Sequence, residues 1–230
     1  MNITTFALLV IVLCGFGAAF ILLPLAKAIP VRIDLQWRRD LEAQATAGSA
    51  MGSPPSFPLP EAALVVALGM LLGGIAIKAY GVTPDGVATC VYLISLLLLA
   101  AINVKSALLP DVVVHPTLWA VLIYHALNGN PANNIYGAAL GFLVPYVLYV
   151  VVRAAKRVEV IGFGDLKTFA LAGAWFGMEA IPYVMGGFLV GLIGYAIASR
   201  TLARGAHGIL PSGPAHLFAS IAFIVGTRVF

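Results

Sequence analysis

Apolar runs of membrane-spanning length divide the chain into about eight segments, and no other feature limits its fold as strongly. A helix needs roughly 20 apolar residues to cross about 30 Å of hydrocarbon, where the backbone must satisfy its own hydrogen bonds. Hydrophobic residues make up 61% of the chain and charged residues only 10%, which excludes a soluble domain. We therefore predict an all-α fold, a polytopic transmembrane helical bundle that forms a single membrane domain over residues 1–230. The predicted segments are 5–25, 62–80, 88–103, 115–127, 134–152, 166–178, 182–199 and 214–229.

The shorter runs are expected to be tilted or to cross the bilayer only in part. The first run lacks the basic start and the small-residue cleavage site of a signal peptide, so we expect a retained helix. The loops 81–86, 129–133 and 179–181 contain no Lys or Arg, whereas the alternate connections are basic. The positive-inside rule then predicts a periplasmic N-terminus and cytoplasmic basic connections. Those connections carry Lys27, Arg32, Arg38 and Arg39, then Lys105, then Arg153, Lys156 and Arg157, then Arg200 and Arg204.

The longest predicted connection, residues 26–61, is expected to be a cytoplasmic loop with two parts. Charged and apolar residues are interspersed over 33–47, which favours an amphipathic helix lying at the membrane interface. Residues 48–60 are rich in Gly, Ser and Pro and favour a flexible tether. A solvated loop with no further role is the alternative.

A polar stretch between two apolar runs contains Gly162, Gly164 and Asp165. A carboxylate in the membrane costs about 2.5–3.5 kcal/mol near the bilayer centre, so an acidic residue there indicates function. Glycines beside it would let an extended substrate backbone approach the carboxylate, and positive φ would cost little there. The alternative is a glycine-rich turn in which Asp165 caps the next helix.

A second polar stretch, on another basic connection, contains Asn103 and Asp111. Because this connection and Asp165 are both expected on the cytoplasmic side, Asn103 and Asp111 are predicted to face Asp165 across the bundle.

Together the two stretches resemble the type IV prepilin peptidases, which are GxGD aspartyl proteases of the bacterial inner membrane. That family carries I-D followed by L-L-P-D in one connection, and E-x-x-G-x-G-D-x-K-L in a later one. The matching residues here are Ile102, Asn103, Leu108, Leu109, Pro110 and Asp111, then Glu159, Gly162, Phe163, Gly164, Asp165 and Lys167. A small-residue helix over 170–177 and a Pro-x-Gly-Pro turn at Pro211-Ser212-Gly213-Pro214 complete the resemblance, which defines a peptidase-like core over residues 91–219.

The resemblance implies an intramembrane aspartyl endopeptidase that cleaves the leader of type IV prepilin or pseudopilin precursors at the cytoplasmic face. It makes Asp165 and position 103 the catalytic pair and gives supporting roles to Asp111, Gly162, Gly164, Lys167 and Glu159. Lys167 is expected to pair with Glu159, to hold a substrate carbonyl or to anchor its helix end at the interface. We expect the lipid bilayer and pilin-like precursors as partners, no nucleic acid, no cofactor and no metal, since the four histidines lack the spacing of metal ligands.

Asn103 stands where the family has its first catalytic aspartate, eight residues before Asp111. Aspartyl proteolysis needs two carboxyl groups that share one proton, and Asn can neither ionise nor exchange that proton. We therefore expect a nearly inactive chain that keeps the shape of the site. We interpret the single difference as a deliberate inactivation, with a natural pseudoenzyme as the alternative.

The predicted loop also differs from larger members of the family, which carry two C-x-x-C pairs there and methylate the cleaved pilin. Residues 29–61 contain no cysteine, so methyl transfer by this chain is an open question. Two other functions remain open from the sequence: a non-catalytic adaptor that binds prepilins, and a small proton-coupled transporter in which Asp111 and Asp165 relay protons. The absence of a visible internal repeat disfavours the transporter.

Overall fold

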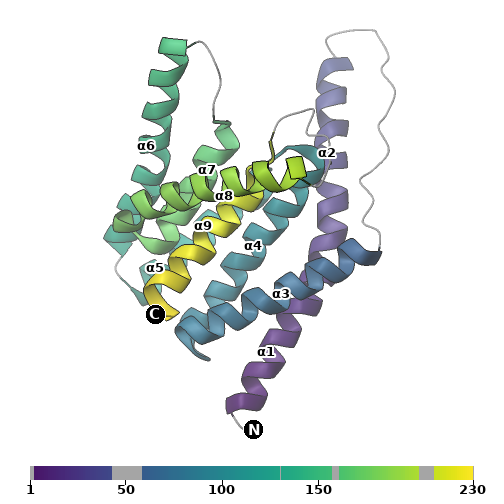
Figure 1. Cartoon of the computed structure of the whole chain (residues 1–230), viewed down its shortest axis with the longest axis vertical. Helices are drawn as coiled ribbons and strands as arrows, with labels where there is room; N and C mark the ends of the chain where they lie inside the picture. Colours follow the sequence, from purple (N-terminus) through teal and green to yellow (C-terminus); the bar gives the residue numbers. More distant parts are fainter. Residues whose placement is uncertain (1–2, 43–58, 130, 157–160, 202–209, 230) are drawn as a thin grey trace.

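The computed structural model describes residues 3–42, 59–129, 131–156, 161–201 and 210–229. These residues are almost entirely helical and contain no strand, so the predicted all-α bundle is confirmed (Figure 1). Every predicted apolar run coincides with a helix. The helices are α1 (Ile3–Gly17), α2 (Leu23–Glu42), α3 (Leu59–Tyr80), α4 (Pro84–Ser106), α5 (Asp111–Asn128), α6 (Pro131–Lys156), α7 (Phe163–Phe176), α8 (Ile181–Thr201) and α9 (Gly213–Ile224).

Within the described ranges, five helical stretches are long and apolar enough to cross a membrane. They are Ala7–Arg32, Leu59–Tyr80, Pro84–Ser106, Pro131–Ala155 and Met178–Ser199. The helices α5, α7 and α9 are not among them. α7 and α9 are only 14 and 12 residues long, and partial crossing of the bilayer by these short runs stays a prediction.

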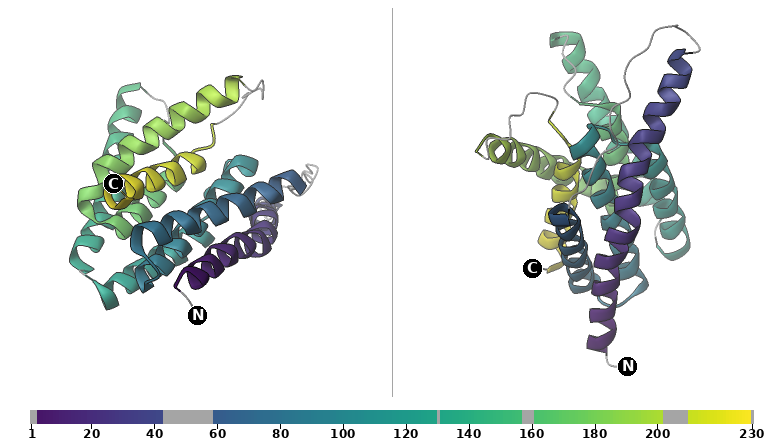
Figure 2. Two further views of the ribbon diagram at one scale, coloured as in Figure 1. Left: turned by 60° about the horizontal axis from the view of Figure 1, so that its bottom comes forward. Right: turned by 90° about the vertical axis from the view of Figure 1, so that its right-hand side faces the viewer.

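The start of the predicted connection 26–61 is helical, as expected for residues 33–42, but the helix begins earlier than predicted, at Leu23. A π-helical turn, Ala18–Leu22, joins α1 to α2, and the two helices form one long rod on one side of the bundle (Figures 1 and 2). The predicted interfacial helix over 33–47 is therefore a continuation of the first helix as far as Glu42. Residues 23–42 include Leu, Arg, Gln and Glu, which are strong helix formers. The π-helical turn lies just before Pro24, whose ring disturbs the preceding helical turn. Most of the predicted tether lies outside the described residues.

The helix α4 forms the centre of the bundle. Tyr92, Leu93, Leu96 and Leu99 on it are almost fully buried, and α4 contacts α2, α3, α5 and α9. A helix with apolar residues on every face is stable only when neighbours cover it on all sides. The two ends of α4 are therefore fixed in position, including the last turn that carries Asn103.

The closest helix pair is α6 and α7. A Cβ added to Gly173 of α7 would overlap the carbonyl oxygen of Gly137 on α6, and the reverse addition would overlap Gly173. Small residues allow such close backbone contact between membrane helices. Since the small residues Ala170, Ala172 and Ala174 of α7 are also buried, α7 is held rigidly and presents Asp165 at its start.

Candidate functional site

Asn103 lies in the last turn of α4 and is buried, with 3% of its surface exposed. Its side-chain oxygen accepts a hydrogen bond from the backbone N–H of Gly213 at 2.8 Å, and its amide nitrogen donates to the carbonyl of Leu108 at 3.3 Å. The helix ends at Ala107, whose left-handed backbone (φ 56°) turns the chain back so that Leu108 reaches Asn103. Both polar ends of the Asn103 amide are therefore hydrogen-bonded inside the protein.

Asp165 lies in the first turn of α7 and is also buried. Its Oδ2 accepts a hydrogen bond from the Gly162 N–H at 3.1 Å, and its Oδ1 lies 3.1 Å from Nε2 of His216. The first contact closes the helix start in the manner of a capping box. The alternative interpretation of Asp165 as a helix cap is thus correct in part, because the same carboxylate also has a buried partner on another helix.

The environment of Asp165, which lies outside the five candidate spans, favours its ionised form. Burial raises the pKa of the Asp165 carboxyl, but the hydrogen bond and charge of His216, the side chain of Ser212 and the N–H of Gly162 outweigh burial. The pKa is therefore lower than that of an ordinary aspartate. The start of a helix also stabilises a negative charge.

His216 is a member of this site that the sequence interpretation missed. It lies in the first turn of α9 with 2% of its surface exposed, and its ring packs between Phe169 and Phe188, with ring centroids 4.6 and 4.5 Å away. The histidine spacing argues against a metal site but gives no information on other roles of His216. The sequence feature that could have indicated His216 as a site residue is its position two residues after the Pro-x-Gly-Pro turn.

The first turn of α9 joins the two predicted catalytic positions. Gly213 binds Asn103, and His216 binds Asp165. Gly213 and His216 are three positions apart at the start of α9. Gly213 must be small, because a Cβ there would lie 2.9 Å from both the Cα of Ala100 and the Cβ of Asn103. That Asn103 and Asp165 face each other across a polar cavity stays a prediction.

The start of α5 and the loop before it contact the start of α7. Nζ of Lys167 lies 2.6 Å from Oδ2 of Asp111, so Asp111 is the observed partner of Lys167. Glu159, which we had expected to pair with Lys167, lies outside the described residues. A Cβ added to Gly164 would lie 2.8 Å from the Cβ of Leu109, so this glycine allows close packing of the start of α7 against the loop before α5. Its expected role in substrate approach stays a prediction.

Gly162 lies beside Asp165, and its expected role in substrate approach stays a prediction. It is exposed, and the nearest atom to a Cβ added there would be Oδ2 of Asp165 at 3.4 Å. Its backbone has φ −79°, so the conformation itself does not require glycine. The free space beside Gly162 and Asp165 is consistent with close approach of a substrate backbone.

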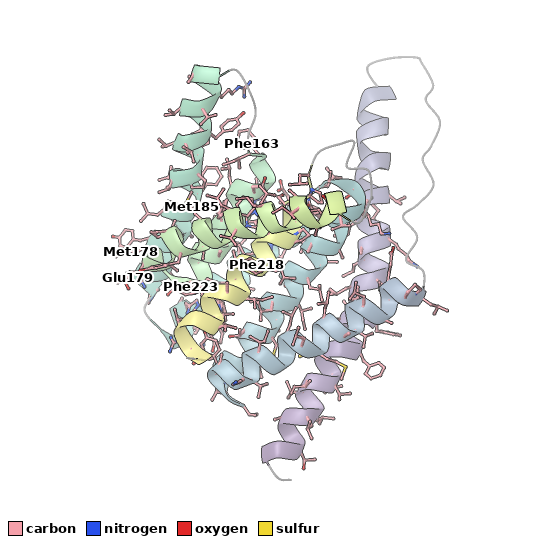
Figure 3. All side chains as sticks on the ribbon, in the orientation of Figure 1. Phe163, Met178, Glu179, Met185, Phe218 and Phe223 are labelled. Carbon is pink, nitrogen blue, oxygen red and sulfur yellow. The ribbon has the colours of Figure 1, made fainter. Side chains whose placement is uncertain are left out.

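Phe163, labelled in Figure 3, marks the side of α7 that meets α6. Its ring centroid lies 5.7 Å from that of Tyr149, and Arg153 of α6 lies over the Tyr149 ring. Across the five described ranges, no group of three or more His, Cys, Asp or Glu side chains could hold a metal ion. The arrangement offers acid–base chemistry from one buried carboxylate, which a histidine contacts.

Comparison with known proteins matches residues 90–199 to the Type IV leader peptidase family. Three relatives are each named prepilin leader peptidase/N-methyltransferase. The protein of Escherichia coli K12 is 35% identical over 129 residues (55% of this chain and 57% of that protein), and that of Burkholderia pseudomallei K96243 is 33% identical over 166 residues (69% and 50%). The protein of Pseudomonas putida is 30% identical over 166 residues (70% and 57%). The matched part of this chain thus spans about half of each relative, and no solved structure matches the chain.

Proposed function

The chain belongs to the type IV leader peptidase family, and we propose that it carries a prepilin-binding site built for aspartyl peptide hydrolysis, which Asn103 leaves almost inactive. The substrate class is a type IV prepilin or pseudopilin precursor, and the bond is the one that joins its leader to the mature chain. The site is the end of the bundle where α4, α7 and α9 meet. We assign it to the cytoplasmic face of a bacterial inner membrane, with the basic connections on the same side.

The hydrogen bonds of Asn103 are the observation that carries this proposal. A protonated carboxyl at position 103 would make the same two contacts, because its O–H donates and its C=O accepts. The amide therefore preserves the packing of α4 against α9 while it lacks the exchangeable proton. A site with this shape and without this proton should bind a precursor and fail to cut it.

The geometry at Asp165 supports the other half of the mechanism. An ionised carboxylate takes a proton from water, and the second carboxyl, which is protonated, polarises the scissile carbonyl. Asp165 is buried, accepts from the Gly162 N–H and His216, and lies next to the open side of Gly162. It is suited to be the ionised member of such a pair.

Methyl transfer, which the names of the relatives include, is not part of the proposal. Residues 29–61 of this chain contain no cysteine, and the sequence contains no glycine-rich nucleotide-binding fingerprint. We restrict the proposed activity to the leader bond.

Cleavage of a prepilin by purified protein in liposomes tests the proposal. We expect the chain itself to cut at near-background rate and Asn103→Asp to raise the rate by about 10²–10⁴-fold, the usual contribution of a positioned acid or base. Asp165→Asn in the Asn103→Asp background should abolish the gain. Full activity with Asn103 in place would contradict the proposal and indicate that Asp111 and Asp165 form the working pair.

An adaptor that binds prepilins without cutting them is the second candidate, favoured by the satisfied hydrogen bonds of Asn103. Cross-linking of a labelled prepilin to the chain measures binding directly. Binding together with no cleavage by a folded Asn103→Asp variant, over several precursors, would support the adaptor and refute the peptidase proposal.

A further inference from the structure

We propose that His216 is a positioning residue that holds Asp165 as the ionised and oriented carboxylate of the site, so that position 103 is the partner that carries the shared proton. This inference rests on the proposed function and assigns the two roles within it. The assignment follows from the different hydrogen-bond partners of the two residues.

The partners of Asp165 are donors. The Gly162 N–H donates to Oδ2, and Nε2 of His216 lies 3.1 Å from Oδ1 in a buried contact. Because a carboxylate only accepts, Nε2 must carry the hydrogen in this pair. Each carboxylate oxygen can accept more than one hydrogen bond, so Asp165 retains capacity for a water molecule.

The second nitrogen of His216 excludes a direct catalytic role. Nδ1 is buried and has no hydrogen-bond partner in the part of the chain that the structure describes. The ring lies between the aromatic side chains of Phe169 and Phe188. A histidine that acts as a base toward water must present a free nitrogen to that water. Among the described residues, the one hydrogen-bond partner of the His216 ring is Asp165, so His216 acts through Asp165.

Position 103 has the opposite environment. Asn103 meets one donor, the Gly213 N–H, and one acceptor, the Leu108 carbonyl. A carboxylate there would face the carbonyl oxygen, which favours a protonated carboxyl. The environments of Asp165 and position 103 therefore favour opposite protonation states.

Hydrolysis requires a chain with Asp at position 103. Asp165 takes a proton from water while the water oxygen bonds to the scissile carbonyl carbon. The π electron pair of the carbonyl moves to its oxygen, which takes the proton of the carboxyl at position 103. Asp165 next gives its proton to the leaving nitrogen as the C–N bond breaks. The carbonyl reforms and returns a proton to position 103.

Other charged groups near this end have separate partners. Lys167, two residues after Asp165, is paired with Asp111. Arg153 of α6 contacts Tyr149, and Lys105 of α4 is paired with Glu61 of α3. His115 lies on the exposed side of α5, one turn after Asp111. His216 is thus the principal titratable partner of Asp165 among the described residues.

The test compares His216→Leu, which has no donor, with His216→Gln, which keeps an N–H donor, both in the Asn103→Asp background. Loss of a hydrogen bond to a charged group predicts a fall in kcat of about ten- to hundredfold for His216→Leu, with little change in KM. The acid limb of the pH profile should move to higher pH, since the ionised form of Asp165 loses a donor. His216→Gln should recover most of kcat and keep the acid limb near its original position.

A second measurement does not depend on cleavage. Infrared titration of the Asp165 carboxyl, obtained as the difference between the chain and Asp165→Asn, reports its protonation with Asn103 in place. His216→Leu should shift that titration to higher pH, and His216→Gln should not. If Asn103→Asp never cleaves but the titration shifts, the peptidase proposal fails and the positioning role stands.

An unchanged pH profile and an unchanged titration in folded His216→Leu protein would overturn the inference. If His216→Leu does not fold, His216→Met takes its place, because a thioether fills the space between two aromatic rings without a donor. Thermal unfolding and gel filtration in detergent establish folding for each variant.

Discussion

The side-chain oxygen of Asn103 accepts a hydrogen bond from the backbone N–H of Gly213 at 2.8 Å, across 110 positions of the sequence. This contact joins the end of α4 to the start of α9, the helix that also supplies His216 to Asp165. The shape of the site is therefore maintained by a residue that lacks the chemistry of the family's aspartate.

Replacement of Asn103 by alanine should destabilise the protein more than replacement by aspartate. Alanine leaves the buried Gly213 N–H without an acceptor, which costs about 1–3 kcal/mol, whereas aspartate retains one. Unfolding in mixed detergent micelles measures the difference. Ser106→Ala is a matched control, because its hydroxyl bonds only within α4, to the Ile102 carbonyl, and should change stability by no more than about 0.5 kcal/mol. Equal losses for the alanine and aspartate variants of Asn103 would refute the structural role.

The ion pair of Lys167 with Asp111 should contribute little to stability. The two side chains are 28% and 52% exposed, so the pair is partly screened by solvent and worth at most about 1 kcal/mol. A double-mutant cycle with Asp111→Asn and Lys167→Gln measures the coupling, which should fall further in high salt.

The same Asp111→Asn change also tests the catalytic assignment. In the Asn103→Asp background it should leave much of the cleavage activity. A loss as large as that caused by Asp165→Asn would instead make Asp111 a member of the catalytic pair.

Substitution of Gly173 by alanine should destabilise the α6–α7 pair. The added methyl would overlap the backbone carbonyl of Gly137, which cannot move without separating the helices, and overpacking of this kind costs about 1–3 kcal/mol or more. Gly186→Ala on α8 is the control, since a Cβ there meets no atom within 4 Å. Stability of each variant is read from thermal unfolding, and similar values for the two would show that the close contact is absent.

Acid should remove the stability that Asp165 contributes. Its pKa in the folded protein is lower than the ordinary value of 3.8 because the donors His216, Ser212 and Gly162 outweigh burial. A lowered pKa stabilises the fold above the unfolded pKa, and this stabilisation disappears as pH falls through the folded pKa. The stability difference between the chain and Asp165→Asn should therefore be constant at neutral pH and shrink below about pH 4. A difference that does not change between pH 6 and pH 3 would contradict the assignment.

The sequence predicted much of the site through its motifs. Asn103, Asp165 and the family to which they belong followed from the residues, and the comparisons confirm the family. Glu159, one expected partner of Lys167, lies outside the described residues, and the helix that includes residue 26 was not predicted as one continuous element. Lys167 contacts Asp111, and the helix continues to Glu42. Short-range patterns gave no information on either point, since the ion pair joins residues 56 positions apart and the helix continues past two prolines.

By itself the sequence determined that this protein is a helical membrane bundle, because long apolar runs have no other stable backbone in a bilayer. It also determined which polar residues are costly enough to indicate a site. Only the tertiary structure decided that His216 partners Asp165 and that Gly213 partners Asn103. Both contacts depend on where the start of α9 lies against α4 and α7. That position is set by the packing of side chains from distant segments, and neither hydropathy nor motif spacing contains this information.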